Sequence, residues 1–361
     1  MKPLVSIVIP AYNAEKWIGY AVQSALAQTW PRKEIIVIND GSTDRTAEVV
    51  RQFASRGMQV VSTENRGLSA AINQGLRICQ GDYIQELDAD DLLAPDKIER
   101  QLAALREGDS KRLLLSSPWA PFYYRTRKAR FIHTSLCQDL SPVEWLLRKL
   151  SENLHMQNAT WLVSRELIEA AGPWKEDLYY DQDGEYFTRV LMASEGTRFV
   201  PETGIFYRVS GAGSISHIGT SKKKKESLLR SMKLHIQYIR SLEESERVRK
   251  ACLAYLQTWY HLFFDSDLAD FVAELQSMAT ELGGSLKSPG ISWKYAWLAA
   301  VIGIPSARNL QDSVSQAKVG VIRRLDKVMF DLERRQAVKG NDSGVNSPPR
   351  KEEDLIANRE S

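Results

Sequence analysis

Three carboxylates within four residues, Asp88, Asp90 and Asp91, are the feature of this sequence with the clearest chemical potential. They follow a strand-like run at 83–87 and precede a turn at Pro95 that leads into a helix. Such acids repel one another unless a cation or hydrogen-bond donors compensate their charge, and their oxygens suit Mg²⁺ or Mn²⁺. The cluster therefore predicts a divalent metal that bridges to a phosphate group. The alternative is an acidic turn that caps the following helix.

The elements that must position this cluster alternate between strand and helix over the first 90 residues. Continuous β-branched runs predict strands, and apolar residues at helical spacing predict helices. Asn13 is expected to cap the first helix, and Ser42 or Thr43 the second. This alternation predicts a mostly parallel sheet flanked by helices. The predicted strands are 5–9, 34–38, 58–62 and 83–87, and the helices occupy the segments after 13, 44–54 and 68–79.

Four loops are expected at one edge of this sheet, because ligands of such folds bind outside the carboxyl ends of the strands. They bring an aromatic ring, Tyr12, a carboxylate, Asp40, and a guanidinium, Arg66, to the acidic cluster. This set predicts a nucleoside diphosphate pocket, with the ring stacked on the base and the acids on a phosphate-bound metal. No GxGxxG follows the first strand and no GxxxxGK[ST] occurs, which argues against dinucleotide enzymes and P-loop NTPases.

The four loops resemble the signature series of family-2 glycosyltransferases. The resemblance rests on VSIVIPAYN at 5–13, VINDGSTD at 37–44, NRG at 65–67 and LDADD at 87–91, in that order. It implies an inverting enzyme of the GT-A fold, an α/β class, that uses a nucleotide-sugar donor, most often a UDP-sugar.

The resemblance also implies roles for single residues. Asp90 matches the direct ligand of Mn²⁺ or Mg²⁺, and Arg66 is expected to contact phosphate because Ile72 stands where many relatives have an arginine. The implied nucleotide-binding residues are Pro10, Tyr12, Asn13, Asp40, Arg66, Asp88 and Ala89.

A second acidic cluster begins at Asp181. Relatives often have Glu-Asp here, and the aspartate is the general base that takes the proton of the acceptor hydroxyl. The resemblance assigns this role to Asp183, with Gln182 in place of the glutamate, and Asp181 and Glu185 are the next candidates. A plain acidic helix start is the structural alternative. Ser210 replaces a histidine that many relatives have. His217 is the remaining candidate for a histidine near the phosphate, although an ordinary loop histidine is the favoured interpretation.

The sequence predicts a catalytic domain at 1–220, with a nucleotide-sugar half at 1–110 and an acceptor half at 111–220. A helical region at 221–335 and a disordered tail at 336–361 follow. In the acceptor half, strands are expected at 113–115, 131–132, 198–200 and 204–208, a basic aromatic turn at 122–128, and a helix capped by Ser141. The lysines at 222–225 favour a helix start over contact with an anionic membrane.

Composition and charge restrict the partners. The chain has 361 residues, 43% of them hydrophobic and 26% charged, with a formal charge of +3, so nothing indicates nucleic-acid binding. The three cysteines form neither a disulfide framework nor a zinc motif, and no signal peptide or spanning helix is expected, which favours the cytoplasm. The aromatic stretch at 293–304 suits an interfacial helix at the inner membrane face, packing against the catalytic domain, or a homo-oligomer contact.

Three functions remain in competition. A glycosyltransferase would act on a carbohydrate, lipid-linked or protein acceptor. A nucleotidyltransferase usually opens with a glycine-rich basic loop, which the residues at 10–13 do not form. A catalytically impaired member that only binds a donor or partner is favoured by Gln182, Ile72 and Ser210, and opposed by intact Asp88, Asp90 and Asp183.

Overall fold

The computed structural model describes residues 2–210, 218–219, 221–263, 268–288, 317 and 319–333. The chain divides into two compact units. The first contains Met1–Ala120, Phe131–Tyr207 and Gly211–Lys287, and the second contains Pro121–Arg130, Arg208–Ser210 and Ser288–Ser361. The predicted domain boundary at residue 220 stays a prediction, and His217, the 293–304 stretch and the tail at 336–361 lie outside the described residues.

The first unit is built on a five-stranded sheet with the order β3-β2-β1-β4-β8. Strands β1 to β4 are parallel, with Val5 of β1 opposite Lys33 of β2 and Tyr83 of β4, and only β8 runs antiparallel to its neighbour. The predicted mostly parallel sheet is therefore confirmed. Its strands are β1 (Val5–Ala11), β2 (Lys33–Asp40), β3 (Gln59–Thr63), β4 (Tyr83–Glu86) and β8 (Val163–Ser164).

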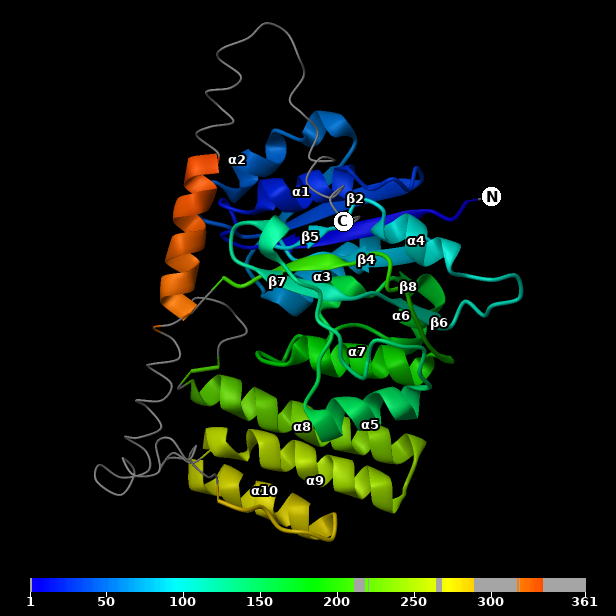
Figure 1. Cartoon of the computed structure of the whole chain (residues 1–361), viewed down its shortest axis with the longest axis vertical. Coiled ribbons are helices and arrows are strands. Elements are labelled where there is room, and N and C mark those ends of the chain that lie inside the picture. The colour runs from blue at the N-terminus through cyan, green and yellow to red at the C-terminus, as the bar shows by residue number, and fades with distance from the viewer. Residues whose placement is uncertain are drawn as a thin grey trace, which may run out of the picture. The chain divides into compact units, whose positions relative to one another are not determined.

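Helices cover both faces of this sheet (Figure 1). Alternate residues of β1 point to opposite faces, as in any strand. Ile7 and Ile9 pack with the buried residues of α1 (Ile18–Leu26) and α2 (Thr46–Arg51), whereas Val8 packs with those of α3 (Leu68–Ile78). Burial on both faces explains why β1 and β2 have continuous apolar runs.

Beyond this sheet, the chain forms shorter strand pairs and the helical region. Strand β10 pairs antiparallel with β5, and β6 pairs parallel with β9. The elements are β5 (Leu92–Leu93), α4 (Lys97–Ala103), β6 (Leu113–Ser116), β7 (Trp119–Phe122), α5 (Pro142–Glu152), α6 (Arg165–Ala171), α7 (Gln182–Ala193), β9 (Gly196–Phe199), β10 (Ile205–Arg208), α8 (Lys222–Leu242), α9 (Glu246–Tyr260) and α10 (Ala269–Glu281). The helical character predicted from residue 226 onward is confirmed over α8 to α10.

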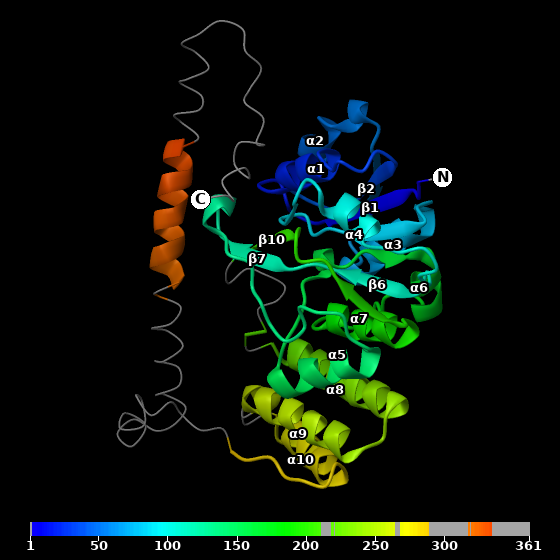
Figure 2. The same cartoon turned by 45° about the vertical axis from the view of Figure 1, so that its right-hand side comes forward.

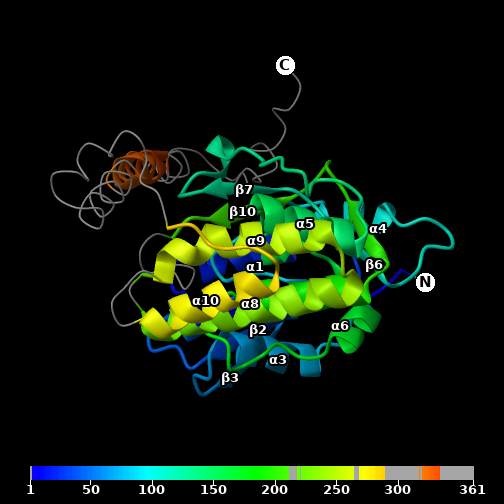
Figure 3. The ribbon, with the colours of Figure 1, turned by 90° about the horizontal axis from the view of Figure 1, so that it is seen from below.

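Helices α5 and α7 connect the sheet to α8, α9 and α10, which lie beyond them in Figures 1 and 2. Figure 3 shows α8 and α9 side by side. Buried apolar residues of all these helices belong to the same core as the sheet residues, including Leu150 of α5, Val190 of α7, Met232 of α8 and Leu256 of α9. The helical region therefore shares one hydrophobic core with the sheet.

Three local predictions were wrong. Helix α1 begins at Ile18 without a side-chain cap, because the Asn13 side chain accepts hydrogen bonds from a neighbouring loop. Helix α2 begins at Thr46, and the side chain of Asp44, not of Ser42 or Thr43, accepts the Thr46 N–H. The strand predicted at 131–132 is irregular. In contrast, Ser141 caps α5 and the lysine run begins α8, as predicted.

In the second unit, residues 319–333 are helical and contact the turn at 121–130. Arg125 of this turn forms ion pairs with Asp326, at 2.7 Å, and with Glu333, at 3.0 Å. The basic aromatic turn therefore uses its arginines within the chain. Within the described part of the chain, the helices are too short or too polar to cross a bilayer.

Candidate active site

The loops after β1 and β2 are locked together by Asn13. Its side-chain oxygen accepts the backbone N–H of Thr43 at 2.8 Å, and its own N–H donates to Ser42 Oγ at 3.0 Å. Asn13 adopts a positive φ of 49°, a left-handed conformation that asparagine tolerates better than most residues. These bonds hold the preceding Tyr12 at the loop surface, where it is 51% exposed and presents its ring to solvent.

Asp40, the last residue of β2, ties this strand to the loop before α3. Its two carboxylate oxygens accept the backbone N–H groups of Arg66, at 2.9 Å, and Gly67, at 2.8 Å. Gly67 has a φ of 92°, which glycine adopts without strain. Each carboxylate oxygen has two lone pairs, so Asp40 retains acceptor capacity for a ligand N–H.

The arginine expected to contact phosphate has a protein partner. Arg66 pairs with Glu176 at 2.9 Å, and both side chains are partly exposed. Asn73 of α3 accepts the Trp174 N–H at 2.8 Å and donates to the Trp174 carbonyl at 2.9 Å, which joins α3 to the turn before α7. Ile72 is buried in the core with Trp174, so its side chain has no access to a ligand.

The acidic cluster after β4 lies in a region of low solvation. Burial, together with the charges of Asp90 and Asp183, raises the pKa of Asp88 to about 7. Burial likewise raises the pKa of Glu86, two residues earlier, to about 8, although the Trp174 indole N–H donates to it at 3.2 Å. Asp91 is fully buried. The repulsion that the sequence predicted is therefore present, and a cation would relieve it.

The structure brings Asp183 of α7 to this cluster. Asp183 contributes to the raised pKa of both Asp88 and Glu86, which places its carboxylate within electrostatic reach of the end of β4. Burial raises the pKa of Asp183 itself, the neighbouring Asp181 raises it further, and Lys149 opposes the change. The two acidic clusters, far apart in sequence, are thus close enough for their charges to interact.

The other two acids of the second cluster are engaged in protein contacts. Glu185 is fully buried, and its oxygens accept two bonds from Arg189, both at 2.9 Å, and one from the Tyr238 hydroxyl at 2.7 Å. Asp181 accepts a hydrogen bond from Ser231 Oγ at 2.5 Å. Asp183 is the carboxylate of this cluster with the fewest side-chain donors described, which favours it over both alternatives as a base.

Polar residues of α8 hold the turn that leads to Asp183, a role that was not predicted from the sequence. Ser227 Oγ accepts the backbone N–H groups of Tyr179, at 2.8 Å, and Tyr180, at 3.0 Å. Ser231 follows one turn later on the same face and binds Asp181, whose φ of 58° is left-handed. The only sequence signal is the helical spacing of polar residues on an otherwise apolar face.

Gly184 and His235 also lie at this turn. A Cβ atom added to Gly184 would lie 2.1 Å from Asp181 Oδ1, so this position accepts only glycine in the observed conformation. His235 lies 3.8 Å from the Asp181 carboxylate, but burial lowers its pKa to about 3, so the ring is neutral and forms no ion pair. Its Nδ1 is instead 3.0 Å from the Tyr255 hydroxyl.

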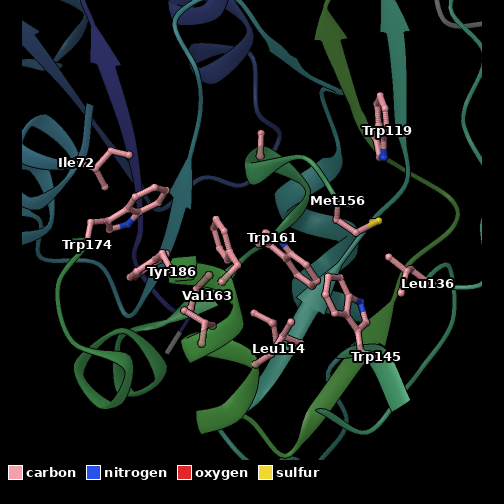
Figure 4. Packing of buried hydrophobic residues seen from close by; sticks show 14 of the residues in the cluster. Ile72, Leu114, Trp119, Leu136, Trp145, Met156, Trp161, Val163, Trp174 and Tyr186 are labelled. Atoms are coloured by element: carbon pink, nitrogen blue, oxygen red, sulfur yellow. The ribbon is translucent and has the colours of Figure 1, made fainter. Parts of the chain in front are cut away.

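Beside Asp183 there is a small cavity of about 50 Å³. Lys149 of α5 and His155 line it opposite the acids, and Trp161 forms part of its wall. Burial lowers the pKa of His155, whose ring lies 5.2 Å from that of Trp119. Figure 4 shows the aromatic core to which Trp161 belongs, and Trp174 of this core stacks on Tyr186 with ring centroids 4.5 Å apart. The wall therefore combines aromatic surface with hydrogen-bonding groups, as carbohydrate sites require.

Within the described residues, no group of three or more His, Cys, Asp or Glu side chains could hold a metal alone. The donors present are nevertheless of the right chemistry, since carboxylate oxygens are ligands that hard divalent cations prefer. A metal here would need further ligands, such as diphosphate oxygens.

Comparison with known proteins gives one family match. Residues 6–139 match the model of glycosyl transferase family 2. An uncharacterized glycosyltransferase of Rickettsia typhi is 31% identical over 192 residues, which are 53% of this chain and 60% of that relative. The chain therefore spans less than two thirds of the length of this relative.

Two solved structures share the fold. One is S. aureus TarS 1-349 in complex with UDP-GlcNAc, with a TM-score of 0.62 and 16% identity over 77% of this chain and 81% of that chain. The other is the mannosyltransferase PcManGT from Pyrobaculum calidifontis in complex with GDP-Man and Mn²⁺, with a TM-score of 0.52 and 20% identity over 95% and 89% of the two chains.

Proposed function

We propose that this chain, as a member of glycosyl transferase family 2, transfers a sugar from a nucleoside diphosphate sugar to an acceptor hydroxyl group. The proposed transfer inverts the configuration at the anomeric carbon. The observation that carries this proposal is the electrostatic coupling of Asp183 to the Asp88 cluster. It supports a single site in which a base faces a phosphate-binding, metal-binding edge.

The donor is proposed to bind at the carboxyl ends of β1, β2 and β4. The exposed ring of Tyr12 is available to stack on a base, and Asp40 can accept a base N–H such as the one that uracil offers. Pro10, near the end of β1, and the loop residues Asn13 and Ala89 would shape this pocket, and Arg66 would exchange Glu176 for phosphate. The nucleoside diphosphate sugars bound in the two similar structures support this donor class.

Asp90, helped by Asp88, would hold a divalent cation together with the diphosphate. The Mn²⁺ of the mannosyltransferase structure supports this assignment. The cation would neutralise the charge that develops on the departing nucleoside diphosphate. Without it, the buried acids would repel the diphosphate instead of binding it.

Asp183 is proposed as the general base. Its raised pKa suits it to accept a proton from an acceptor hydroxyl as the anomeric carbon is attacked from the opposite side to the leaving group. The small cavity beside it, lined by Lys149, His155 and Trp161, is proposed to receive the reacting hydroxyl group of the acceptor. Carbohydrate, lipid-linked and protein acceptors all offer the hydroxyl that this geometry requires.

The test is sugar transfer by wild type and Asp183→Asn. A panel of nucleotide-sugars with Mn²⁺ is screened by mass spectrometry for nucleotide release, and UDP affinity is measured by calorimetry. We expect Asp183→Asn to slow transfer by ~10² to 10⁴-fold, the usual cost of losing a general base, with unchanged UDP affinity. The control is Asp270→Asn, on the exposed surface of α10.

Two outcomes would contradict the proposal. If wild type binds UDP but releases no nucleotide from any donor, the chain is a binding member without transferase activity. If Asp183→Asn transfers sugar within a few-fold of wild type, the base lies elsewhere.

A further inference from the structure

The wall of the cavity beside Asp183 contains a buried amide whose oxygen is unpaired. Asn158 lines this cavity and is only 7% exposed. Its Oδ1 has no hydrogen-bond partner within the described part of the chain. Buried polar groups are normally hydrogen-bonded, because an unpaired one keeps the full cost of its lost hydration. An unpaired amide in the wall of a cavity therefore indicates a ligand that supplies the missing bond.

The turn that carries Asn158 is held in place by other side chains. Asn158 begins a short 3₁₀ turn, Asn158–Thr160. The carbonyl groups of three consecutive residues at this turn accept hydrogen bonds from fully buried side chains of β4 and α4. These bonds run from Gln85 to Ala159, at 2.9 Å, from Gln101 to Thr160, at 3.0 Å, and from Lys97 to Trp161, at 3.2 Å. The backbone of Asn158 is thus fixed without its side chain, which is preorganised for a ligand.

Aromatic rings form the adjoining part of the wall. Trp145 and Trp161 both line the cavity, with ring centroids 5.6 Å apart. Figure 4 shows the two rings next to each other, below Met156. The indole N–H of Trp145 is a second buried donor without a partner in the described residues. Aromatic surface with a few unpaired polar groups is typical of a site for a small polar ligand.

The size of the cavity restricts what enters it. Its volume is about 50 Å³, and Asn158 and Asp183 both line it. At roughly 10 to 15 Å³ for each water-sized group, it has room for several hydroxyl groups and not for a whole sugar ring. One edge of an acceptor therefore enters, and that edge meets both the proposed base and the amide.

We propose that the acceptor is a sugar whose reacting hydroxyl faces Asp183 while a neighbouring hydroxyl is hydrogen-bonded to Asn158. The inference rests on the proposed function, since it names the acceptor class of the same site. An amide has both donor and acceptor atoms, as has a hydroxyl group, so the two are matched. A sugar carries hydroxyl groups on adjacent carbons and can engage both side chains through one edge. A serine or threonine side chain of a protein acceptor has a single hydroxyl and would leave Asn158 unpaired.

The experiment is a titration of the full chain with the methyl glycosides of glucose, galactose, mannose and N-acetylglucosamine. Binding is followed by ligand-detected NMR with UDP and Mg²⁺ present and no donor sugar, so it requires no turnover. We expect at least one glycoside to bind. Of its monodeoxy analogues, at least one should bind roughly 2- to 12-fold more weakly, the range for one neutral hydrogen bond. N-acetylserinamide, the probe for a protein acceptor, should bind more weakly than this glycoside.

The variant is Asn158→Leu, which keeps the approximate volume of the side chain and removes the unpaired amide. It should therefore unfold at a temperature no lower than wild type. It should bind the glycoside more weakly by the same factor and no longer distinguish it from that deoxy analogue. Asn158→Ala is the second variant and should show the same two losses. The matched control is Gln157→Ala, the adjacent amide residue, which does not line the cavity and should bind like wild type.

Four results would overturn the inference. They are a wild type that binds none of the glycosides, Asn158 variants that bind as well as wild type, N-acetylserinamide binding as tightly as the best glycoside, and a large loss of thermal stability in both variants. Failure of the proposed function is distinguishable from these results. Glycoside binding that depends on Asn158, without nucleotide release from any donor, would defeat the transfer and leave the sugar site in place. Transfer by wild type with binding that ignores Asn158 would defeat this inference alone.

Discussion

The polar face of α8 should control the rate of transfer through the position of Asp181 and Asp183. The change is Ser231→Ala, which removes the buried hydroxyl that binds the partly buried Asp181 carboxylate at 2.5 Å and leaves all other contacts of α8 in place. Asp181 directly precedes α7 in a left-handed conformation, so its movement would be transmitted to Asp183 in the first turn.

The magnitude follows from the type of bond that is lost. A hydrogen bond to a charged group contributes about 1.5 to 3 kcal/mol, and its donor here is fully buried. If all of this energy serves to hold the base in its reactive position, kcat falls by roughly 10- to 150-fold, since about 1.4 kcal/mol corresponds to tenfold. UDP affinity should not change, because the proposed contacts to the uracil nucleobase come from the loops after β1 and β2.

The assay compares kcat, the KM for the donor, UDP affinity and the thermal unfolding midpoint for wild type and Ser231→Ala. Ser241→Ala is the control, since Ser241 is on the exposed surface of the same helix and bonds only within it. Rates are measured well below the lower unfolding midpoint, so that loss of folded protein does not contribute. A positioning role lowers kcat alone, whereas a purely structural role lowers the unfolding midpoint alone.

The reasoning is refuted if Ser231→Ala has the kcat of wild type while its unfolding midpoint drops. It is also refuted if kcat and UDP affinity fall together, because α8 would then support the nucleotide pocket.

Three further predictions concern the donor loops. Asp90→Asn should fold like wild type and lose the metal dependence of UDP binding, measured by calorimetry with and without Mn²⁺; unchanged metal dependence would remove Asp90 from the metal site. Tyr12→Ala should weaken UDP binding by about 1 to 3 kcal/mol at unchanged stability, and Tyr12→Phe should restore it, because the exposed ring acts by stacking. Asp40→Ala should lower the free energy of unfolding in urea by about 1 to 3 kcal/mol, since it leaves the N–H groups of Arg66 and Gly67 unpaired. The same variant should also bind UDP more weakly. A variant with wild-type stability would contradict the observed hydrogen bonds.

Much of the fold could be predicted because its determinants are local. Continuous apolar runs and helical periodicity identified strands β1 to β4 and helices α1 to α3 to within a few residues. The rule that ligands bind at the carboxyl ends of parallel strands then placed the loops at 10–13, 40–44 and 88–91 on one edge, before any contact between them was known.

Capping was less predictable, since it depends on competition for the same side chain. Asn13 has the right composition and place for a cap, yet its oxygen binds Thr43 from the next loop. Asp44 took the role expected of Ser42 or Thr43 for the same reason, because Ser42 already accepts the Asn13 N–H. Local propensity lists the candidates, and the tertiary neighbour selects among them.

The sheet, its expected ligand edge and the chemical types of the site residues could be inferred from the sequence, since they follow from periodicity and from short spacing along the chain. Three relationships required the folded structure: Asp183 lies near Asp88, Asp40 holds the loop at Arg66, and Ser231 supports Asp181 from 50 residues away. Such pairs depend on how separate elements pack, and no local pattern encodes the packing. The hydrogen bonds that position a base are therefore visible only once the core has brought α7 and α8 together.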